Sequence, residues 1–208
     1  MALFQAMQFS QVKCLISIQS ENPESYMFHT PNIHLVEKQA EAIGIPIIIQ
    51  QTKGVKEEEL VDLKHAITKA MQEYHIEGVV TGAIESVYQA SRIQKICDEL
   101  KIECFNPLWQ KDQFAILHDL VLLGFDVIII GVFAEGMELF LGKKIDEKFI
   151  DAMHIAHAKY LIHVGGEGGE YESFVLNAPF FRKKLVIKKS HIENRGNGAK
   201  VLVIDELE

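Results

Sequence analysis

The fold is decided by a strand, a small-residue turn and a helix start, which follow one another in Val79-Val80-Thr81-Gly82-Ala83-Ile84-Glu85-Ser86. The spacing of apolar residues predicts a strand over 77–81 and a helix over 85–100. In open parallel sheets ligands bind at the carboxyl ends of strands, where glycine lets a ligand approach the backbone. The stretch therefore predicts a ligand site at the end of a parallel strand. The simpler alternative is a βα turn that only needs small residues.

The same alternation of strand and helix extends through the first half of the chain. Short runs rich in β-branched residues predict strands over 12–19 and 45–50. Helical spacing predicts helices over 32–43 and 56–74, with the acids at 57–59 in the first turn of the second helix. Strands separated by helices indicate right-handed crossovers and a parallel sheet.

The second half follows a different pattern, which predicts a domain boundary between residues 1–104 and 105–208. Helices are expected first, and strands then follow one another without intervening helices, with a turn over 194–198. This order predicts a small α+β domain with an antiparallel element at its C-terminal end. The expected helices are 112–123 and 147–160, and the expected strands are 125–133, 173–176, 184–189 and 200–204.

Composition excludes several classes of protein. The chain has 208 residues, of which 48% are hydrophobic and 24% charged, as in an ordinary globular protein. Its longest apolar run, 127–134, is too short to cross a bilayer, and the first ten residues lack a basic secretory signal. The net charge of −8 argues against a nucleic-acid partner, because binding to phosphate backbones requires clustered cations. Three cysteines without C-x-x-C spacing indicate buried thiols in a reducing cytoplasm.

A glycine-rich acidic segment is the strongest chemical signal: Gly165-Gly166-Glu167-Gly168-Gly169-Glu170-Tyr171-Glu172. So many glycines are expected where N–H groups converge on an anion, or where a side chain occupies a strained turn. The carboxylates suit a site that also holds Mg²⁺, or that positions ammonia or a proton. The alternative is a flexible, solvated turn. His154 and His157 lack further ligands at zinc spacing, so no resident metal is predicted.

Two further groups of side chains follow predicted strand ends. Tyr26 and His29 lie in the loop after the first strand, where functional groups concentrate. Tyr88 and Arg92 are spaced i, i+4 and so share a helical face, and Trp109 follows the next strand. An arginine in a cleft is a natural partner for phosphate or carboxylate. The alternatives are a surface arginine and histidine and packed aromatic side chains.

Together these motifs resemble the diphthine–ammonia ligases, of the N-type ATP pyrophosphatase (PP-loop) group. The resemblance runs from about Ala2 to about Val186 and implies a HUP-like, doubly wound parallel sheet followed by a smaller α+β domain, with the active site between them. It is carried, in order, by Ser25 to Thr30, Gly82 to Gln89 with Arg92, Pro107 to Trp109, Leu141 to Lys143 and Gly165 to Phe174.

The resemblance also implies a reaction and its residues. ATP with Mg²⁺ would adenylate the carboxylate of diphthine on translation elongation factor two, and ammonia would then displace AMP to give diphthamide, in the cytoplasm. It implies catalytic roles for Glu167, Glu170 and Arg92. It implies nucleotide contacts from Ser17, Gly82, Ala83, Gly168 and Gly169. It implies substrate contacts from Tyr26, His29, Tyr88 and Trp109.

One departure from the family pattern affects both fold and function. The family's S-G-G-K-D-S loop would precede Met1, and residues 1–7 look like the helix that follows that loop. Either the chain starts at an internal Met of a longer protein, or it is a paralogue that has lost ATP hydrolysis. Without its central first strand, the sheet is expected to rearrange or to borrow an edge from a partner, giving a homo-oligomer.

Two other functions remain open from sequence. One is a non-catalytic module that binds adenine nucleotides through the same strand ends. The other is an amidotransferase or thiolation enzyme that acts on a different carbonyl, and the acidic net charge weighs against RNA as its substrate.

Overall fold

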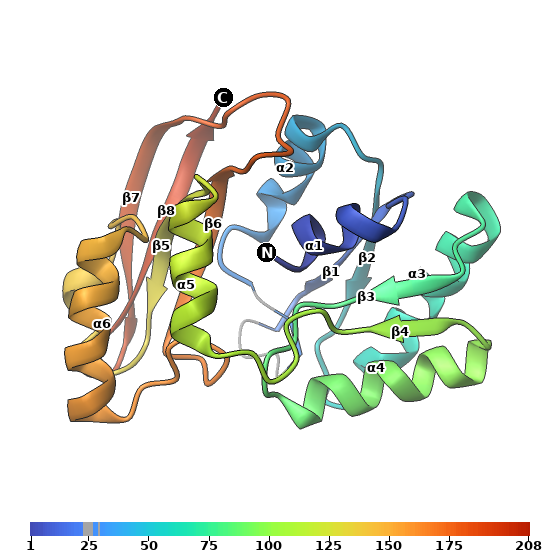
Figure 1. Ribbon diagram of the computed structural model, residues 1–208, viewed down its shortest axis with the longest axis horizontal. Coiled ribbons are helices and arrows are strands. Elements are labelled where there is room, and N and C mark those ends of the chain that lie inside the picture. The colour runs from blue at the N-terminus through green and yellow to red at the C-terminus, as the bar shows by residue number, and fades with distance from the viewer. Residues whose placement is uncertain (23–26, 29) are drawn as a thin grey trace. The chain divides into compact units, whose positions relative to one another are not determined.

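The computed structural model describes residues 1–22, 27–28 and 30–208, which divide into two compact units, Met1–Gln110 and Lys111–Glu208 (Figure 1). Two of the predicted substrate residues, Tyr26 and His29, lie outside the described residues. The first unit alternates helices with parallel strands, and the second contains an antiparallel sheet with helices. The predicted fold class, an α/β unit followed by an α+β unit, is confirmed.

The first unit places short parallel strands between helices. Strands β1 and β2 pair in parallel, as do β3 and β4. The elements are α1 (Ala2–Phe9), β1 (Leu15–Ser20), η1 (Ile33–Leu35), α2 (Val36–Ile43), β2 (Ile47–Thr52), α3 (Glu59–Tyr74), β3 (Gly78–Val80), α4 (Val87–Leu100) and β4 (Glu103–Phe105).

The parallel strands of this unit do not form one continuous sheet. Within the described residues, they form two separate two-stranded sheets, β1–β2 and β3–β4. Helix α1 contacts β3. A borrowed edge from a second copy stays a prediction.

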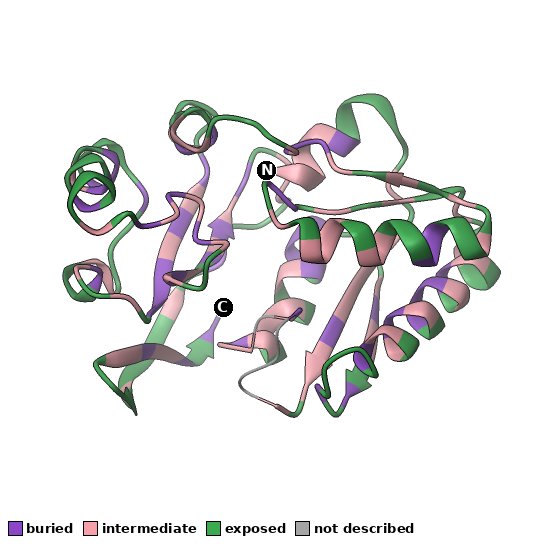
Figure 2. Ribbon diagram, turned by 90° about the horizontal axis from the view of Figure 1, so that it is seen from below, coloured by how far each residue is buried: buried purple, intermediate pink, exposed green. Residues whose placement is uncertain are grey.

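The core of the first unit is the contact between α3 and the β1–β2 pair. Its α3 face is lined by small and aliphatic residues that solvent hardly reaches, so the helix packs closely on the strands (Figure 2). Ile18 and Ile48 contribute from β1 and β2. The α3 members of this face are Leu63, Ala66, Ile67 and Ala70.

The start of α3 corrects a sequence prediction. The helix begins at Glu59, whereas helical spacing predicted a start at Lys56 with the acids at 57–59 in its first turn. Glu57 lies before the helix with a φ of 69°, a left-handed conformation that a helix interior does not tolerate. Its carboxylate is bound by Arg92 on α4, a tertiary contact that local sequence does not reveal.

The second unit is an antiparallel sheet in the order β6-β5-β8-β7, accompanied by helices. Strand β5 lies between β6 and β8 and is its most buried strand. Asp112 and Asp146 cap α5 and α6 by accepting hydrogen bonds from backbone N–H groups in the first turn. The elements are α5 (Gln113–Leu122), β5 (Asp126–Val132), η2 (Glu138–Phe140), α6 (Glu147–Tyr160), β6 (Tyr171–Asn177), β7 (Ile187–Gly196) and β8 (Ala199–Leu207).

The β7–β8 hairpin is longer and tighter than predicted. Strand β7 continues to Gly196, so the turn is Asn197-Gly198 rather than 194–198. Both turn residues have positive φ, 48° and 81°, as a two-residue type I′ turn requires. The extension was missed because β7 is an exposed edge strand of mostly polar residues, which has no hydrophobic alternation to detect.

His191 on β7 gives this hairpin a pH dependence. Its ring lies 3.0 Å from Asp205 and 3.5 Å from Glu193, and the hydrogen bond to Asp205 raises its pKa above 6.5. Because the pKa of His191 is higher in the folded protein, its charged contacts with Asp205 and Glu193 contribute fully to stability below pH 6.5. This contribution is lost as the pH rises through the pKa of His191 in the folded protein. An NMR titration should show Asp205→Asn lowering the pKa of His191. An unchanged midpoint would contradict the pairing.

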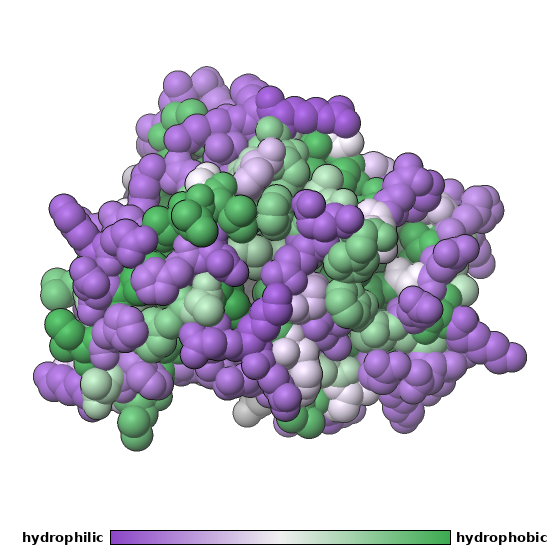
Figure 3. All heavy atoms as spheres, viewed as in Figure 1, coloured by the Kyte–Doolittle hydropathy of each residue, from purple (hydrophilic) through white to green (hydrophobic). Residues whose placement is uncertain are grey.

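Hydrophilic side chains cover much of the face seen in Figure 3, with apolar patches between them. Several large apolar side chains are strongly exposed, among them Leu122, Leu139 and Leu161. Within the described part of the chain, no helix is both long and apolar enough to span a bilayer.

Candidate functional site

The loops that follow β1 and β2 are bonded to each other. Ser20 Oγ accepts a hydrogen bond from the Asn22 N–H at 3.1 Å, and Asn22 Nδ2 donates to the Gly54 carbonyl at 3.0 Å. Gly54 has a φ of 67°, and a Cβ there would overlap Ser20 Oγ and lie 2.6 Å from the Asn22 Cβ. Glycine is therefore required where these two strand ends meet.

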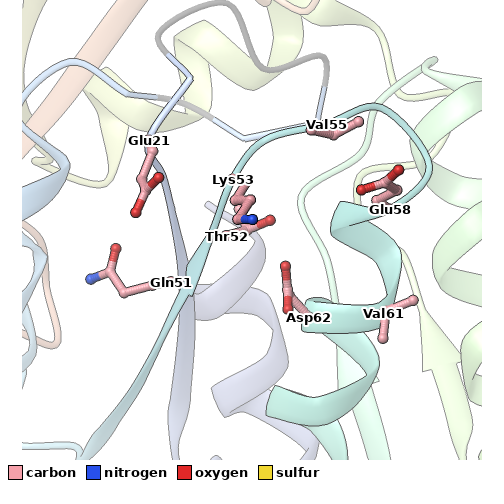
Figure 4. Close-up of a pocket in the computed structure, with 8 residues that line it drawn as sticks. All are labelled: Glu21, Gln51, Thr52, Lys53, Val55, Glu58, Val61 and Asp62. Carbon is pink, nitrogen blue, oxygen red and sulfur yellow. The ribbon is translucent and has the colours of Figure 1, made fainter.

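An open hollow of about 510 Å³ lies beside these loops, at the carboxyl end of β2 (Figure 4). Thr52 and Lys53 line it from the β2 side, and Glu58 and Asp62 from the α3 side (Figure 4). Its charged side chains are three carboxylates and one ammonium, and this excess of negative charge repels a nucleotide phosphate. No residue of this hollow was singled out from sequence. The full lining is Glu21, Gln51, Thr52, Lys53, Val55, Glu58, Val61 and Asp62.

The loops that follow β3 and β4 are also tied together. The Thr81 hydroxyl is hydrogen bonded to Asn106 Oδ1, and the Thr81 N–H donates to the Phe105 carbonyl at 3.0 Å. The Gln110 N–H donates to the Ile84 carbonyl at 2.7 Å. The two strand ends therefore form one platform, defined here as residues 81–84 and 106–110.

The predicted nucleotide residues of this unit differ in accessibility. Gly82 is exposed on the platform, and a Cβ there would meet only the Ala2 Cβ, at 4.0 Å. Ala83 is buried, with its N–H 3.4 Å from Thr81 Oγ1. Trp109 is half-buried on the same platform, and Ser17 is half-buried within β1, opposite Ile49. The backbone of Gly82 is thus accessible and uncrowded on the platform.

Arg92 and Tyr88 come together on α4, as their spacing predicts, around a carboxylate that sequence reasoning missed. The Arg92 guanidinium lies 3.5 Å from the centre of the Tyr88 ring, and its Nη1 donates to the Tyr88 carbonyl. Arg92 Nε donates to Glu57 Oε1 at 2.9 Å, and the Tyr88 hydroxyl donates to the same oxygen at 3.2 Å. Lys56 Nζ lies 5.3 Å from the Tyr88 ring centre.

The electrostatics of this cluster follow from the shared oxygen. The hydrogen bond from Arg92 lowers the pKa of Glu57, and the same bond raises the pKa of Arg92. Burial raises the pKa of Tyr88, so its hydroxyl stays protonated as a donor. A carboxylate is therefore bound at neutral pH by a guanidinium and a phenol on one helix.

In the second unit, the glycine-rich segment is a turn in which the N–H groups of residues 165, 166, 167 and 169 are hydrogen bonded within the unit. The N–H of Gly165 donates to Gln113 Oε1 at 3.0 Å, and that of Glu167 donates to His163 Nδ1 at 3.2 Å. The N–H groups of Gly166 and Gly169 donate to carbonyls of His163 and Gly166. Of the two roles expected for the glycines, this favours a tight turn that holds a side chain, rather than N–H groups that converge on an anion. A nucleotide contact from the Gly169 N–H stays a prediction and requires that bond to open.

The backbone positions that require glycine have a definite location in this turn. Gly166 and Gly169 have φ values of 76° and 81°, the left-handed region that suits glycine. A Cβ on Gly166 would lie 3.1 Å from the Tyr171 carbonyl oxygen and 3.2 Å from the Tyr171 ring. Tyr171 is buried, and its hydroxyl donates to the Val164 carbonyl at 2.7 Å. The turn is thus fixed on a buried tyrosine at the start of β6.

Glu170 is the carboxylate that this turn positions. Its Oε1 accepts a hydrogen bond from the His163 N–H at 2.8 Å, while its Oε2 is buried and has no hydrogen-bond partner within the described part of the chain. The Glu170 carbonyl accepts from the Phe133 N–H at 2.9 Å, which fixes the backbone against β5. One oxygen of this oriented carboxylate is thus buried and unpaired in the described part of the chain.

His163 and Gln113 complete the group, and neither was predicted from sequence as a site residue. His163 Nε2 lies 3.0 Å from Gln113 Nε2 and 3.8 Å from Glu167 Oε2. Sequence offered one usable signal, since His163 lies just before the glycine-rich segment. Gln113 comes from α5, some fifty positions away, and only the folded unit brings it to the turn.

The fold and the site residues define a class of protein. A nucleotide-type α/β unit with polar groups at its parallel strand ends is joined to an α+β unit that contains the glycine-rich turn with Glu167 and Glu170, here called the carboxylate turn. Residues 1–104 match the model of the diphthamide synthase N-terminal domain, and residues 112–204 match that of the C-terminal domain. The chain belongs to the diphthamide synthase family.

Curated relatives carry one name across vertebrates and yeast. The diphthine–ammonia ligase of Danio rerio is 34% identical over 181 residues, covering 81% of this chain and 71% of the relative. Those of Rattus norvegicus and Homo sapiens are 33% and 31% identical over 186 residues, covering 83% of this chain and 69% of each relative.

Proposed function

We propose that this protein is an ATP-dependent amide ligase that converts diphthine on translation elongation factor two to diphthamide. The observation that supports this most strongly is the match of both halves of the chain to the two diphthamide synthase domains. The name of the relatives gives diphthine and ammonia as their reactants. The carboxylate turn and the strand-end platform supply the kinds of group that such a reaction needs.

The proposed reaction has two steps that balance in atoms and charge. A carboxylate oxygen of diphthine attacks the α-phosphorus of ATP, and pyrophosphate leaves. Ammonia then attacks the acyl carbon, a proton is lost, and AMP leaves. The first step brings two anions together, so it needs fixed donors and cations aimed at the phosphates and the carboxylate.

The first unit offers those groups at its strand ends. Gly82 leaves the platform open for a nucleotide, with Ala83 and Ser17 as further proposed contacts. Arg92, with Tyr88, is proposed to bind the anionic group that approaches the nucleotide. Trp109 is proposed to contact the substrate from the platform. Tyr26 and His29 stay predicted substrate contacts.

The second unit offers Glu170 as the proposed general base. Its Oε2, which is buried without a hydrogen-bond partner in the described part of the chain, is proposed to accept a proton from ammonium, or from the amine nitrogen after attack, while Oε1 stays on the His163 N–H. Glu167, beside His163, is proposed to act with it. The tight turn at Gly168 and Gly169 keeps both carboxylates at one place, although their role as phosphate contacts stays a prediction.

Mg²⁺ is expected to reach such a site with ATP. Magnesium in nucleotide sites uses one or two carboxylates together with phosphate oxygens and water. The turn offers the carboxylates of Glu167 and Glu170 for that demand, and no cluster of three His, Cys, Asp or Glu side chains able to hold a metal occurs in residues 1–22, 27–28 and 30–208. The residues therefore fit a cation carried by the nucleotide, which would neutralise phosphate charge.

The proposal is tested with diphthine-bearing elongation factor two, ATP and ammonium. We expect AMP and pyrophosphate in equal amounts, together with an amide nitrogen in the modified histidine that derives from ¹⁵N-ammonium. The control replaces ammonium with sodium. Pyrophosphate release without amide formation, or neither product at any enzyme concentration, would refute the ligase assignment.

The interrupted sheet favours one alternative, a module that binds adenine nucleotides without turnover. Two separate strand pairs offer strand ends for a ligand but no continuous parallel sheet in the described residues. Calorimetry with ATP and with AMP distinguishes the two functions. Binding of both nucleotides with no AMP formed from ATP in the full assay would support the binding module.

A further inference from the structure

The carboxylate of Glu57 occupies the donors on α4 that an anionic ligand would need. We propose that Arg92, Tyr88 and Lys56 form a subsite for a carboxylate or phosphate group, and that Glu57 is its internal occupant, displaced when such a ligand binds. This gives Glu57 a competitive role that neither its position before α3 nor its sequence context indicates. The identity of the natural anion rests on the proposed function, but the subsite itself does not.

The geometry supports a displaceable contact. Arg92 Nε and Nη2 and the Tyr88 hydroxyl all converge on one oxygen, Glu57 Oε1. A guanidinium edge with a neighbouring hydroxyl is the donor set that binds phosphate and carboxylate ligands. Nη1 donates to the Tyr88 carbonyl and the guanidinium stacks on the ring, so Arg92 stays oriented when the carboxylate leaves.

The accessibility of the partners indicates which of them moves. The Glu57 side chain is 53% exposed, whereas that of Arg92 is 27% exposed. Glu57 also has a left-handed backbone, φ 69°, in a turn rather than in the helix that follows. An exposed ion pair of this kind contributes little net stability, so a ligand that brings its own charge can replace it at small cost. The guanidinium is therefore the fixed element and the carboxylate the mobile one.

The test uses Glu57→Gln in the full chain, with inorganic pyrophosphate and succinate as separate probes in calorimetry. Removing the internal carboxylate should tighten binding of the preferred probe about fivefold. The matched control is Glu58→Gln, an equal charge change at the next residue, which lines the hollow beside Asp62. The control accounts for the general loss of negative charge, so its effect should be clearly smaller. The stronger of the two probes identifies the ligand as phosphate or carboxylate.

A direct readout comes from the Arg92 Nε–H resonance. It should shift when Glu57 is replaced, and should shift again with probe, while Arg92→Gln abolishes binding. Equal affinities in Glu57→Gln, Glu58→Gln and the unchanged chain would overturn the proposal, as would lower thermal stability of Glu57→Gln without tighter binding. Because no turnover is measured, a failed ligase assay leaves this result standing, and a failed binding test leaves the ligase proposal standing.

Discussion

Replacing Glu170 by glutamine is expected to lower kcat for amide formation by about 10²-fold or more, with KM for the protein substrate nearly unchanged. Glutamine keeps an oxygen to accept the His163 N–H, so the turn can stay folded. It cannot take up a proton, so the step that needs a base is lost. The measurement is ¹⁵N-amide formation at saturating ATP and ammonium.

A matched control separates this role from a structural one. Glu138→Gln removes the same charge from an exposed position of the same unit, in η2, and should leave kcat unchanged. Thermal unfolding should show both variants close to the unchanged chain. A Glu170→Gln variant that retains full kcat, or one that loses activity only in proportion to its unfolding, would show that Glu170 is not the base.

Replacing Gly166 by alanine is expected to destabilise the second unit by about 2–4 kcal/mol. The left-handed backbone contributes about 1–2 kcal/mol, because φ is 76°. Crowding contributes about 1–2 kcal/mol more, because the new methyl meets the backbone and ring of buried Tyr171. At roughly 2–4 °C per kcal/mol, Tm should fall by roughly 5–15 °C in a thermal melt.

Gly169→Ala is the control for this prediction. Its φ is 81°, but its Cβ position has nothing within 4 Å, so only the backbone cost of about 1–2 kcal/mol applies. The difference between the two variants therefore measures packing against Tyr171. Equal losses of stability would mean that the turn relaxes away from Tyr171 and that the contact does not fix it.

Sequence patterns found the regular elements because burial there follows a simple period. The alternation of strands and helices in the first half, and the change to consecutive strands in the second, reproduce the observed architecture. Predictions were wrong where periodicity is absent or overridden. The predicted strand missed the polar C-terminal part of edge strand β7, and α3 begins only after Glu57, which has a left-handed backbone and contacts Arg92.

The candidate site was likewise predictable from sequence only in part. Tyr88 and Arg92 were predictable as neighbours because i, i+4 spacing places them on one helical face. Their third member, Glu57, comes from another segment, and no local rule relates it to α4. Gln113 reaches the glycine-rich turn from α5 in the same manner.

The amino-acid sequence alone determined the family, the order of helices and strands and the existence of the carboxylate turn, because these depend on residue types at fixed spacings. Only the tertiary structure decided which partners the N–H groups of the turn find within the second unit, that one Glu170 oxygen is buried without a partner in the described residues, and that Glu57 binds Arg92. Those facts depend on which backbone and side-chain groups meet after the chain folds, and spacing along the chain does not encode such meetings.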